Sequence, residues 1–153
     1  MNDSLVANAQ IAIDAAPAEV WKALTEPRAI KQYMFGADVE SEWREGSAIS
    51  WSGEMKGRRY RDKGVILRIE PDRMLCYGHF SPQSGKPDRP ENYHIVTIRL
   101  TGNDDRTEVC LTQDNNADEQ ERKASQNNWN VILDGLRSFV ESEHVFDACQ
   151  ARR

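Results

Sequence analysis

Apolar and polar residues alternate along most of the chain, a pattern that predicts β-strands with one buried face. Residues 5–14 begin it, with one face formed by Leu5, Ala7, Ala9, Ile11 and Ile13. About six further strands are predicted in FGADVESEW, REGSAISWSGE, GRRYRDKGVILRIEP, RMLCYGHF, NYHIVTIRL and RTEVCLTQD. The predicted inner positions of these strands are Ile49 and Trp51; Val65, Leu67 and Ile69; Leu75, Tyr77 and His79; His94, Val96, Ile98 and Leu100; and Val109, Leu111 and Gln113.

Two short helices are predicted directly after the first strand. Pro17 suits the first position of a helix, and the stripe of Val20, Trp21 and Leu24 follows at helical spacing. Pro27 begins a second helix within residues 26–34. The segment 81–90 contains three prolines and one glycine, so we expect a loop there that could close one end of a cavity.

A long amphipathic helix is predicted over residues 115–141, with Asn116 and Glu119 forming a capping box. Its second half presents an apolar stripe made of Trp129, Ile132, Leu133, Leu136 and Val140. Its first half turns polar residues toward the same side as Trp129, namely Asp118, Arg122, Ser125 and Gln126. Two interpretations stay open: the polar half covers a cavity, or it extends into solvent with Arg122 paired to Asp118.

Strands that follow one another, with helices at the ends, predict an α+β fold in which one curved antiparallel sheet wraps around the long C-terminal helix. The 153 residues suit a single domain over 1–153, with residues 144–153 predicted to be a mobile tail.

Composition and charge narrow the classes of function. The net charge of −5, without a basic block, argues against a nucleic-acid partner. There is no long apolar run, so we expect no membrane span, and no signal peptide is visible. Three cysteines, an odd number, argue against a disulfide framework and favour the cytoplasm. Cys76 and Cys110 are predicted to be buried thiols.

The chain resembles the START-related (SRPBCC, helix-grip) superfamily, in the branch of activator of heat-shock-protein-90 ATPase homologues. The resemblance is carried by APAEVWKALTEPRAIKQYM, WREGSAISW, GVILRIEPDRMLCYGHF, TEVCLTQDN and NNWNVILDGLRSF, which together span nearly all of residues 10–142. It implies a helix-grip fold with a cavity between the sheet and the long helix. Gln113 and His79 stand where many relatives carry histidine and tryptophan, which would add polar groups to the inner face.

The function implied by this resemblance is the binding of a small apolar or lipid-like molecule, with a stress-related or chaperone-related role. Candidate ligand-binding residues combine an aromatic and apolar wall, polar groups and one cation. They are Met34, Phe35, Trp43, Trp51, Tyr77, His79, His94, Gln113, Arg122, Trp129 and Leu133. For each aromatic residue, ordinary core packing is the alternative.

Two other functions stay open. In a cyclase or dehydratase acting on polyketide-type or aromatic substrates, His79 and His94 would supply acid–base chemistry. In a co-chaperone-like interaction module, an exposed apolar patch would bind a protein partner. We expect binding rather than catalysis, and no cofactor or metal, because no phosphate-binding loop or metal-ligand spacing occurs. A stripe of small residues on the outer side of the long helix suggests a homodimer; it consists of Val131, Gly135, Ser138 and Ser142.

Overall fold

Seven antiparallel strands form one curved sheet in the computed structural model, which describes the backbone of residues 5–151 and the side chains of residues 5–143. The strands are β1 (Ala7–Ile13), β2 (Asp38–Ser41), β3 (Ala48–Met55), β4 (Arg58–Glu70), β5 (Met74–Phe80), β6 (His94–Gly102) and β7 (Thr107–Gln113). Their order in the sheet is β1-β7-β6-β5-β4-β3-β2, so the first strand pairs with the last. The predicted α+β class and strand content are confirmed.

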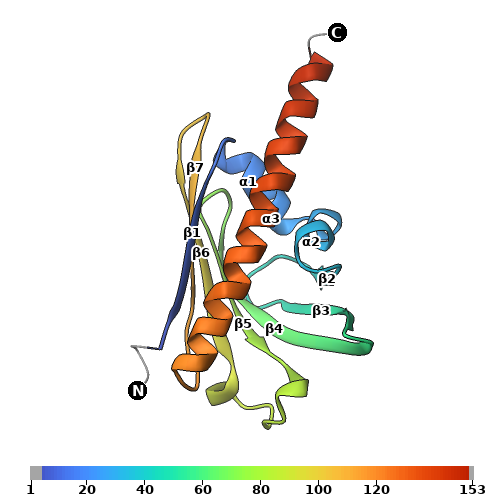
Figure 1. Ribbon diagram of the computed structural model, residues 1–153, viewed down its shortest axis with the longest axis vertical. Helices are drawn as coiled ribbons and strands as arrows, with labels where there is room; N and C mark the ends of the chain where they lie inside the picture. The colour runs from blue at the N-terminus through green and yellow to red at the C-terminus, as the bar shows by residue number, and fades with distance from the viewer. Residues whose placement is uncertain (1–4, 152–153) are drawn as a thin grey trace.

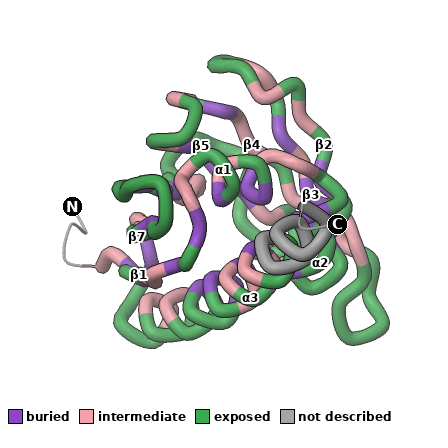
Figure 2. Tube along the Cα trace, turned by 90° about the horizontal axis from the view of Figure 1, so that it is seen from above, coloured by how far each residue is buried: buried purple, intermediate pink, exposed green. Residues whose placement is uncertain are grey.

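The helices lie on the concave side of this sheet. They are α1 (Pro17–Thr25), α2 (Pro27–Tyr33) and the long α3 (Glu119–Ala151), with two short 3₁₀ turns, η1 (Pro82–Ser84) and η2 (Pro90–Asn92), between β5 and β6. Figure 1 shows α3 crossing the sheet obliquely, with α1 and α2 beside it. Seen from above, the sheet curls around one side of α3 (Figure 2). The two short helices after the first strand are therefore confirmed, and each begins at its predicted proline.

The start and the length of α3 differ from the prediction. The helix has 33 residues and begins at Glu119, so the predicted capping box of Asn116 and Glu119 is wrong. The cap is instead the Asp118 carboxylate, which accepts the N–H of Glu121 at 2.8 Å. Asn116 lies before the helix and is completely buried. The mobile tail predicted over residues 144–153 stays a prediction, because the side chains of residues 144–151 and all of residues 152–153 lie outside the described residues.

A β-bulge in β4 overturns one predicted face. The pairing of β4 with β5 shifts between Ile66 and Arg68, so the alternation is broken at Leu67. Ile66 is completely buried in the core, whereas Leu67 is 46% exposed. The regular alternation of residues 65, 67 and 69 predicted from sequence therefore fails, because the extra residue reverses the orientation of the side chains that precede it.

The core lies between the concave face of the sheet and the helices. From α3 it receives the predicted stripe, Trp129, Ile132, Leu133, Leu136 and Val140, all buried. Gly135 was assigned to an outer stripe, but a Cβ there would lie 3.1 Å from Cβ of Tyr33 in α2. The glycine therefore allows α2 to approach α3 closely. Cys110 is exposed, contrary to prediction, and Cys76 is partly buried.

None of the helices within the described residues combines the length and the apolar character that a membrane crossing requires.

Candidate functional site

A cavity of about 360 Å³ opens between α3 and the sheet, within the volume range of small-molecule sites. Its walls come from the strands β3 to β7, from the segments that follow α2 and β5, and from α3. The lining residues are Met34, Phe35, Ala37, Trp51, Met55, Tyr60, Asp62, Tyr77, His79, Ser81, Gln83, His94, Val96, Gln113, Ser125, Asn128, Trp129 and Ile132.

Aromatic side chains from neighbouring strands form one wall. The ring of Trp51 lies 5.1 Å from that of Tyr77 and 5.0 Å from that of His79, the latter in an edge-to-face arrangement. These separations are within the favourable range for aromatic pairs. Burial raises the pKa of the Tyr77 phenol well above its ordinary value, so this hydroxyl stays neutral. The part of this wall formed by Trp51 and Tyr77 is therefore uncharged and largely apolar.

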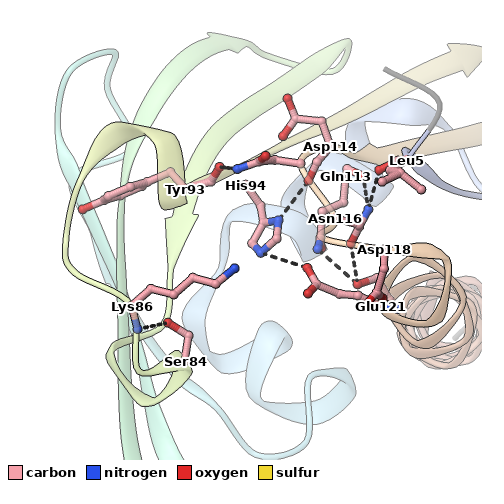
Figure 3. Close-up of polar contacts among 12 residues, drawn as sticks. Leu5, Ser84, Lys86, Tyr93, His94, Gln113, Asp114, Asn116, Asp118 and Glu121 are labelled. Atoms are coloured by element: carbon pink, nitrogen blue, oxygen red, sulfur yellow. Dashed lines mark hydrogen bonds and ion pairs between the residues drawn. The ribbon is translucent and has the colours of Figure 1, made fainter. Parts of the chain in front are cut away.

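Two imidazoles stand side by side on the same face of the sheet. His79 on β5 is paired with His94 on β6, and their ring centres are 6.4 Å apart. Nε2 of His79 lies 2.9 Å from a carboxylate oxygen of Asp62 on β4. Nδ1 of His94 donates to the carbonyl of Asp114 at 2.9 Å (Figure 3). Because both partners are acceptors, each neutral ring carries its hydrogen on the bonded nitrogen.

The uncommitted nitrogen of His94 is directed toward α3. Its Nε2 lies 3.8 Å from a carboxylate oxygen of Glu121, as the dashed line in Figure 3 shows. This distance is too long for a hydrogen bond to the neutral ring, but it suits an ion pair when the ring is protonated. The first turn of α3 thus approaches β6 at this end of the cavity.

Gln113 supports the cavity wall through a chain of hydrogen bonds. Its side-chain oxygen accepts the indole N–H of Trp129 at 2.6 Å, and its amide donates to Ser125 at 3.3 Å. Ser125 donates to Asn116 at 3.0 Å, and Asn116 donates to the carbonyls of Leu5 and Gln113, visible in Figure 3. Gln113 was expected to face a ligand; both ends of its amide are engaged within the protein.

The polar half of α3 divides into two flanks, which resolves the two interpretations of its inward face. Ser125 and Asn128 lie on the flank that lines the cavity. Gln126 lies on the other flank and accepts the backbone N–H of Asn8 in the edge strand β1 at 3.2 Å. Arg122 donates to Gln126 at 3.0 Å and pairs with Glu119, not with Asp118 as the second interpretation required. Half of this face therefore serves the cavity and half anchors the sheet edge.

The structure brings eight of the predicted site residues to the cavity: Met34, Phe35, Trp51, Tyr77, His79, His94, Gln113 and Trp129. Trp43 and Leu133 instead border a space of about 30 Å³ deeper in the core, whose walls share Trp51, Tyr77 and Trp129 with the cavity. Arg122 does not line either space, because its side chain lies on the β1 flank of α3.

Several lining residues were not found from the sequence. Asp62 and Tyr60 alternate within RRYRDKG, a run of charged residues that gives no apolar signal for an inner face. The only sequence signal is that Tyr60, Asp62 and Gly64 occupy alternate positions of one strand, and Gly64 is the residue paired with His79. Burial raises the pKa of Tyr60, and the negative charge of Asp62 raises it further. Asn128 was missed because it is a polar residue in the polar run Ser125–Asn128, just before the apolar stripe begins at Trp129.

The mouth of the cavity exposes apolar side chains. Phe35 and Met55 both line it and are 48% and 45% exposed. The segment 81–90, expected to close one end, contributes Ser81 and Gln83, and the Gln83 amide donates to the carbonyl of Arg59 at 2.9 Å. Whether this segment moves stays a prediction.

Metal binding finds no support in the described part of the chain, where no group of three or more His, Cys, Asp or Glu side chains is arranged to hold an ion.

Comparison with known proteins identifies relatives. The profile of the family described as activator of Hsp90 ATPase homolog 1-like protein matches residues 14–141. No curated protein matches the sequence. Many solved structures do, including ChR145 from Cytophaga hutchinsonii, with 51% identity, a TM-score of 0.81 and coverage of 95% of this chain and 99% of that chain.

Two more distant structures share the fold. CalU16 from Micromonospora echinospora is 28% identical, with a TM-score of 0.67 and coverage of 90% of this chain and 77% of its own. The Aha1 dimer from Colwellia psychrerythraea is 22% identical, with a TM-score of 0.70 and coverage of 89% and 96%. The predicted relationship to the activator branch of the helix-grip superfamily is thereby confirmed.

Proposed function

Because this chain belongs to the family of activator of Hsp90 ATPase homolog 1-like proteins, we propose that it binds a small apolar or amphipathic molecule between its sheet and α3. The observation that carries this proposal is the cavity of about 360 Å³, with aromatic walls and a few polar groups facing it. Small-molecule sites have this composition, because apolar walls supply affinity and a few polar groups fix orientation.

Features of the walls favour a ligand over a collapsed core. The indole of Trp129 and the amide of Gln113 satisfy one another, so this part of the wall holds its shape without a ligand. The exposed Phe35 and Met55 at the mouth give an apolar ligand its first contact. His79 and His94 are the polar groups that orient it, since each ring has one nitrogen hydrogen-bonded to the protein and one that forms no hydrogen bond with the described residues.

The first experiment is native mass spectrometry of the protein as purified from cells, followed by extraction of any bound molecule. An added mass near stoichiometric level supports the proposal and gives the chemical class. Binding is then measured with N-phenyl-1-naphthylamine, an uncharged probe that fluoresces in apolar surroundings.

Two variants of neighbouring residues decide where the probe binds. Asn128 is exposed and lines the cavity, so Asn128→Trp places an indole at its mouth without disturbing the core. Asn127 is also exposed but does not line the cavity, because it lies about 100° around α3 from Asn128. We expect Asn128→Trp to weaken probe binding at least tenfold and Asn127→Trp to leave it unchanged. Equal binding by both variants would place the probe elsewhere and contradict the proposal.

The interaction-module alternative rests on the same exposed pair, Phe35 and Met55. The ligand proposal accounts for both residues as the cavity mouth, so we prefer it. A homodimer, a chaperone or stress-related partner and a cytoplasmic location stay predictions, and the native mass measures the oligomeric state directly.

A further inference from the structure

An aspartate and a histidine meet at the cavity surface, from two adjacent strands. Asp62 on β4 and His79 on β5 approach to 2.9 Å, and their side chains are 19% and 27% exposed. Both line the cavity. A carboxylate can only accept, so the hydrogen of the neutral ring is on Nε2 and the lone pair is on Nδ1. Among the described residues, Nδ1 of His79 has no hydrogen-bond partner.

This arrangement is typical of a general base, with one ring nitrogen bonded to a carboxylate and the other available to accept a proton. An imidazole lone pair accepts a proton near neutral pH, and a carboxylate on the other nitrogen fixes the tautomer and stabilises the imidazolium that forms. His94, the other cavity imidazole, is bonded to a backbone carbonyl, which carries no full negative charge. The pair of Asp62 and His79 is therefore the stronger candidate for proton transfer.

The surroundings specify what can be brought to this base. The indole of Trp51 packs against His79 at 5.0 Å, and Tyr77 is the next aromatic ring along the same wall. A flat apolar ring that stacks on this wall would have its edge beside the imidazole. Within the described part of the chain no lysine or arginine lines the cavity, which disfavours a ligand that enters as an anion.

We propose that His79 is a general base that removes a proton from a weakly acidic C–H or O–H group of an aromatic ligand in the cavity. Asp62 is its positioning residue. This activity goes beyond binding and rests on the proposed function, because the ligand must enter the same cavity. A base placed in this way contributes roughly 10²–10⁴ in rate.

The probe reaction is the elimination of 5-nitrobenzisoxazole, which needs one base and no other reactant. His79 takes the proton from C3, and the electrons of the C–H bond become the third bond of a nitrile. The N–O bond breaks and its electron pair stays on oxygen, giving 2-cyano-4-nitrophenolate, which is followed by absorbance. A substrate deuterated at C3 reacts more slowly if proton removal limits the rate.

We expect turnover faster than that given by free imidazole at the same concentration, with a clear isotope effect. His79→Gln should lower kcat/KM by about 100-fold or more. Asp62→Asn should lower kcat while leaving KM nearly unchanged, because the amide neither fixes the tautomer nor stabilises the imidazolium. Asp104→Asn makes the same change of charge at an exposed residue outside the cavity and should leave the rate unchanged.

Binding of 5-nitroindazole, a similar ring system that cannot eliminate, separates the two proposals. If it binds but wild type and His79→Gln turn over the substrate equally, the base is overturned and the binding function stands. If it does not bind, access to the base fails and the inference is overturned, while the purified protein's own ligand still tests the binding function. Thermal unfolding of each variant verifies its fold, and loss of turnover in folded Asp62→Asn, with unchanged KM, supports the proposal.

Discussion

Removing the side-chain amide of Asn116 is the sharpest test of how the cavity end of the molecule is held together. This residue is completely buried although it lies outside every helix and strand. Its amide donates to the carbonyl of Leu5 at 2.8 Å and to that of Gln113 at 3.1 Å. Its oxygen accepts the hydroxyl of Ser125 at 3.0 Å. It thus joins the entry to β1, the end of β7 and the first turns of α3.

The magnitude follows from these three bonds. Each contributes about 0.5–1.5 kcal/mol, so the three bonds together contribute about 1.5–4.5 kcal/mol. Asn116→Ala should therefore lower the free energy of unfolding by about 3 kcal/mol. For a chain of this size, each kcal/mol shifts Tm by roughly 2–4 °C, so Tm should fall by about 6–12 °C.

Urea unfolding followed by tryptophan fluorescence measures this change, because Trp129 is bonded to Gln113 in the same network. Asn127→Ala, an exposed asparagine on α3, is the matched control and should stay within about 0.5 kcal/mol of wild type. Ser125→Ala should cost less than Asn116→Ala, because it leaves both carbonyl bonds intact. A loss below about 1 kcal/mol for Asn116→Ala would refute the reasoning that these bonds stabilise the fold.

Two further perturbations test the packing of the sheet and the burial of its phenols. A Cβ on Gly64 would lie 1.8 Å from the carbonyl oxygen of Gly78, so Gly64→Ala should lower the free energy of unfolding by about 3 kcal/mol or more. A Cβ on Gly78 would have its nearest neighbour 3.6 Å away, so Gly78→Ala should be nearly neutral. Urea unfolding of both variants measures the difference. Burial raises the pKa values of Tyr33 and Tyr77 in the folded protein. Above about pH 10 these phenols therefore ionise in the unfolded state but not in the folded state. The stability that they contribute is complete below about pH 10 and falls as the pH rises further. Unfolding free energies measured across that range should decline less steeply in Tyr33→Phe and Tyr77→Phe.

Equal stability of Gly64→Ala and Gly78→Ala would show that the close approach of β4 and β5 at Gly64 does not require a glycine. A slope against pH that is unchanged when both phenols are absent would show that neither hydroxyl is buried in solution.

The candidate site was only partly accessible from the sequence. The aromatic wall and both imidazoles could be predicted, because Tyr77, His79 and His94 lie in strands whose alternation marks an inner face. Asp62 could not, because it lies in a charged run and its meaning depends on a partner in another strand. The pairing of β4 with β5, which places Asp62 near His79, is a property of the sheet order.

The sequence by itself determined the local elements of this protein. Alternation of apolar residues specified most strand faces, Pro17 and Pro27 marked the starts of two helices, and the stripe beginning at Trp129 specified the buried side of α3. These follow from the periods of the backbone, which each segment carries without its neighbours.

Only the tertiary structure decided which flank of α3 lines the cavity and which anchors β1. Ser125 and Gln126 are adjacent and equally polar, yet one faces the cavity and the other holds the N–H of Asn8 in the edge strand. Likewise, the bulge between Ile66 and Arg68 reversed a face that alternation alone had assigned. A sequence pattern gives the direction of a side chain relative to its own element, whereas its partners depend on how that element is rotated against the rest of the fold.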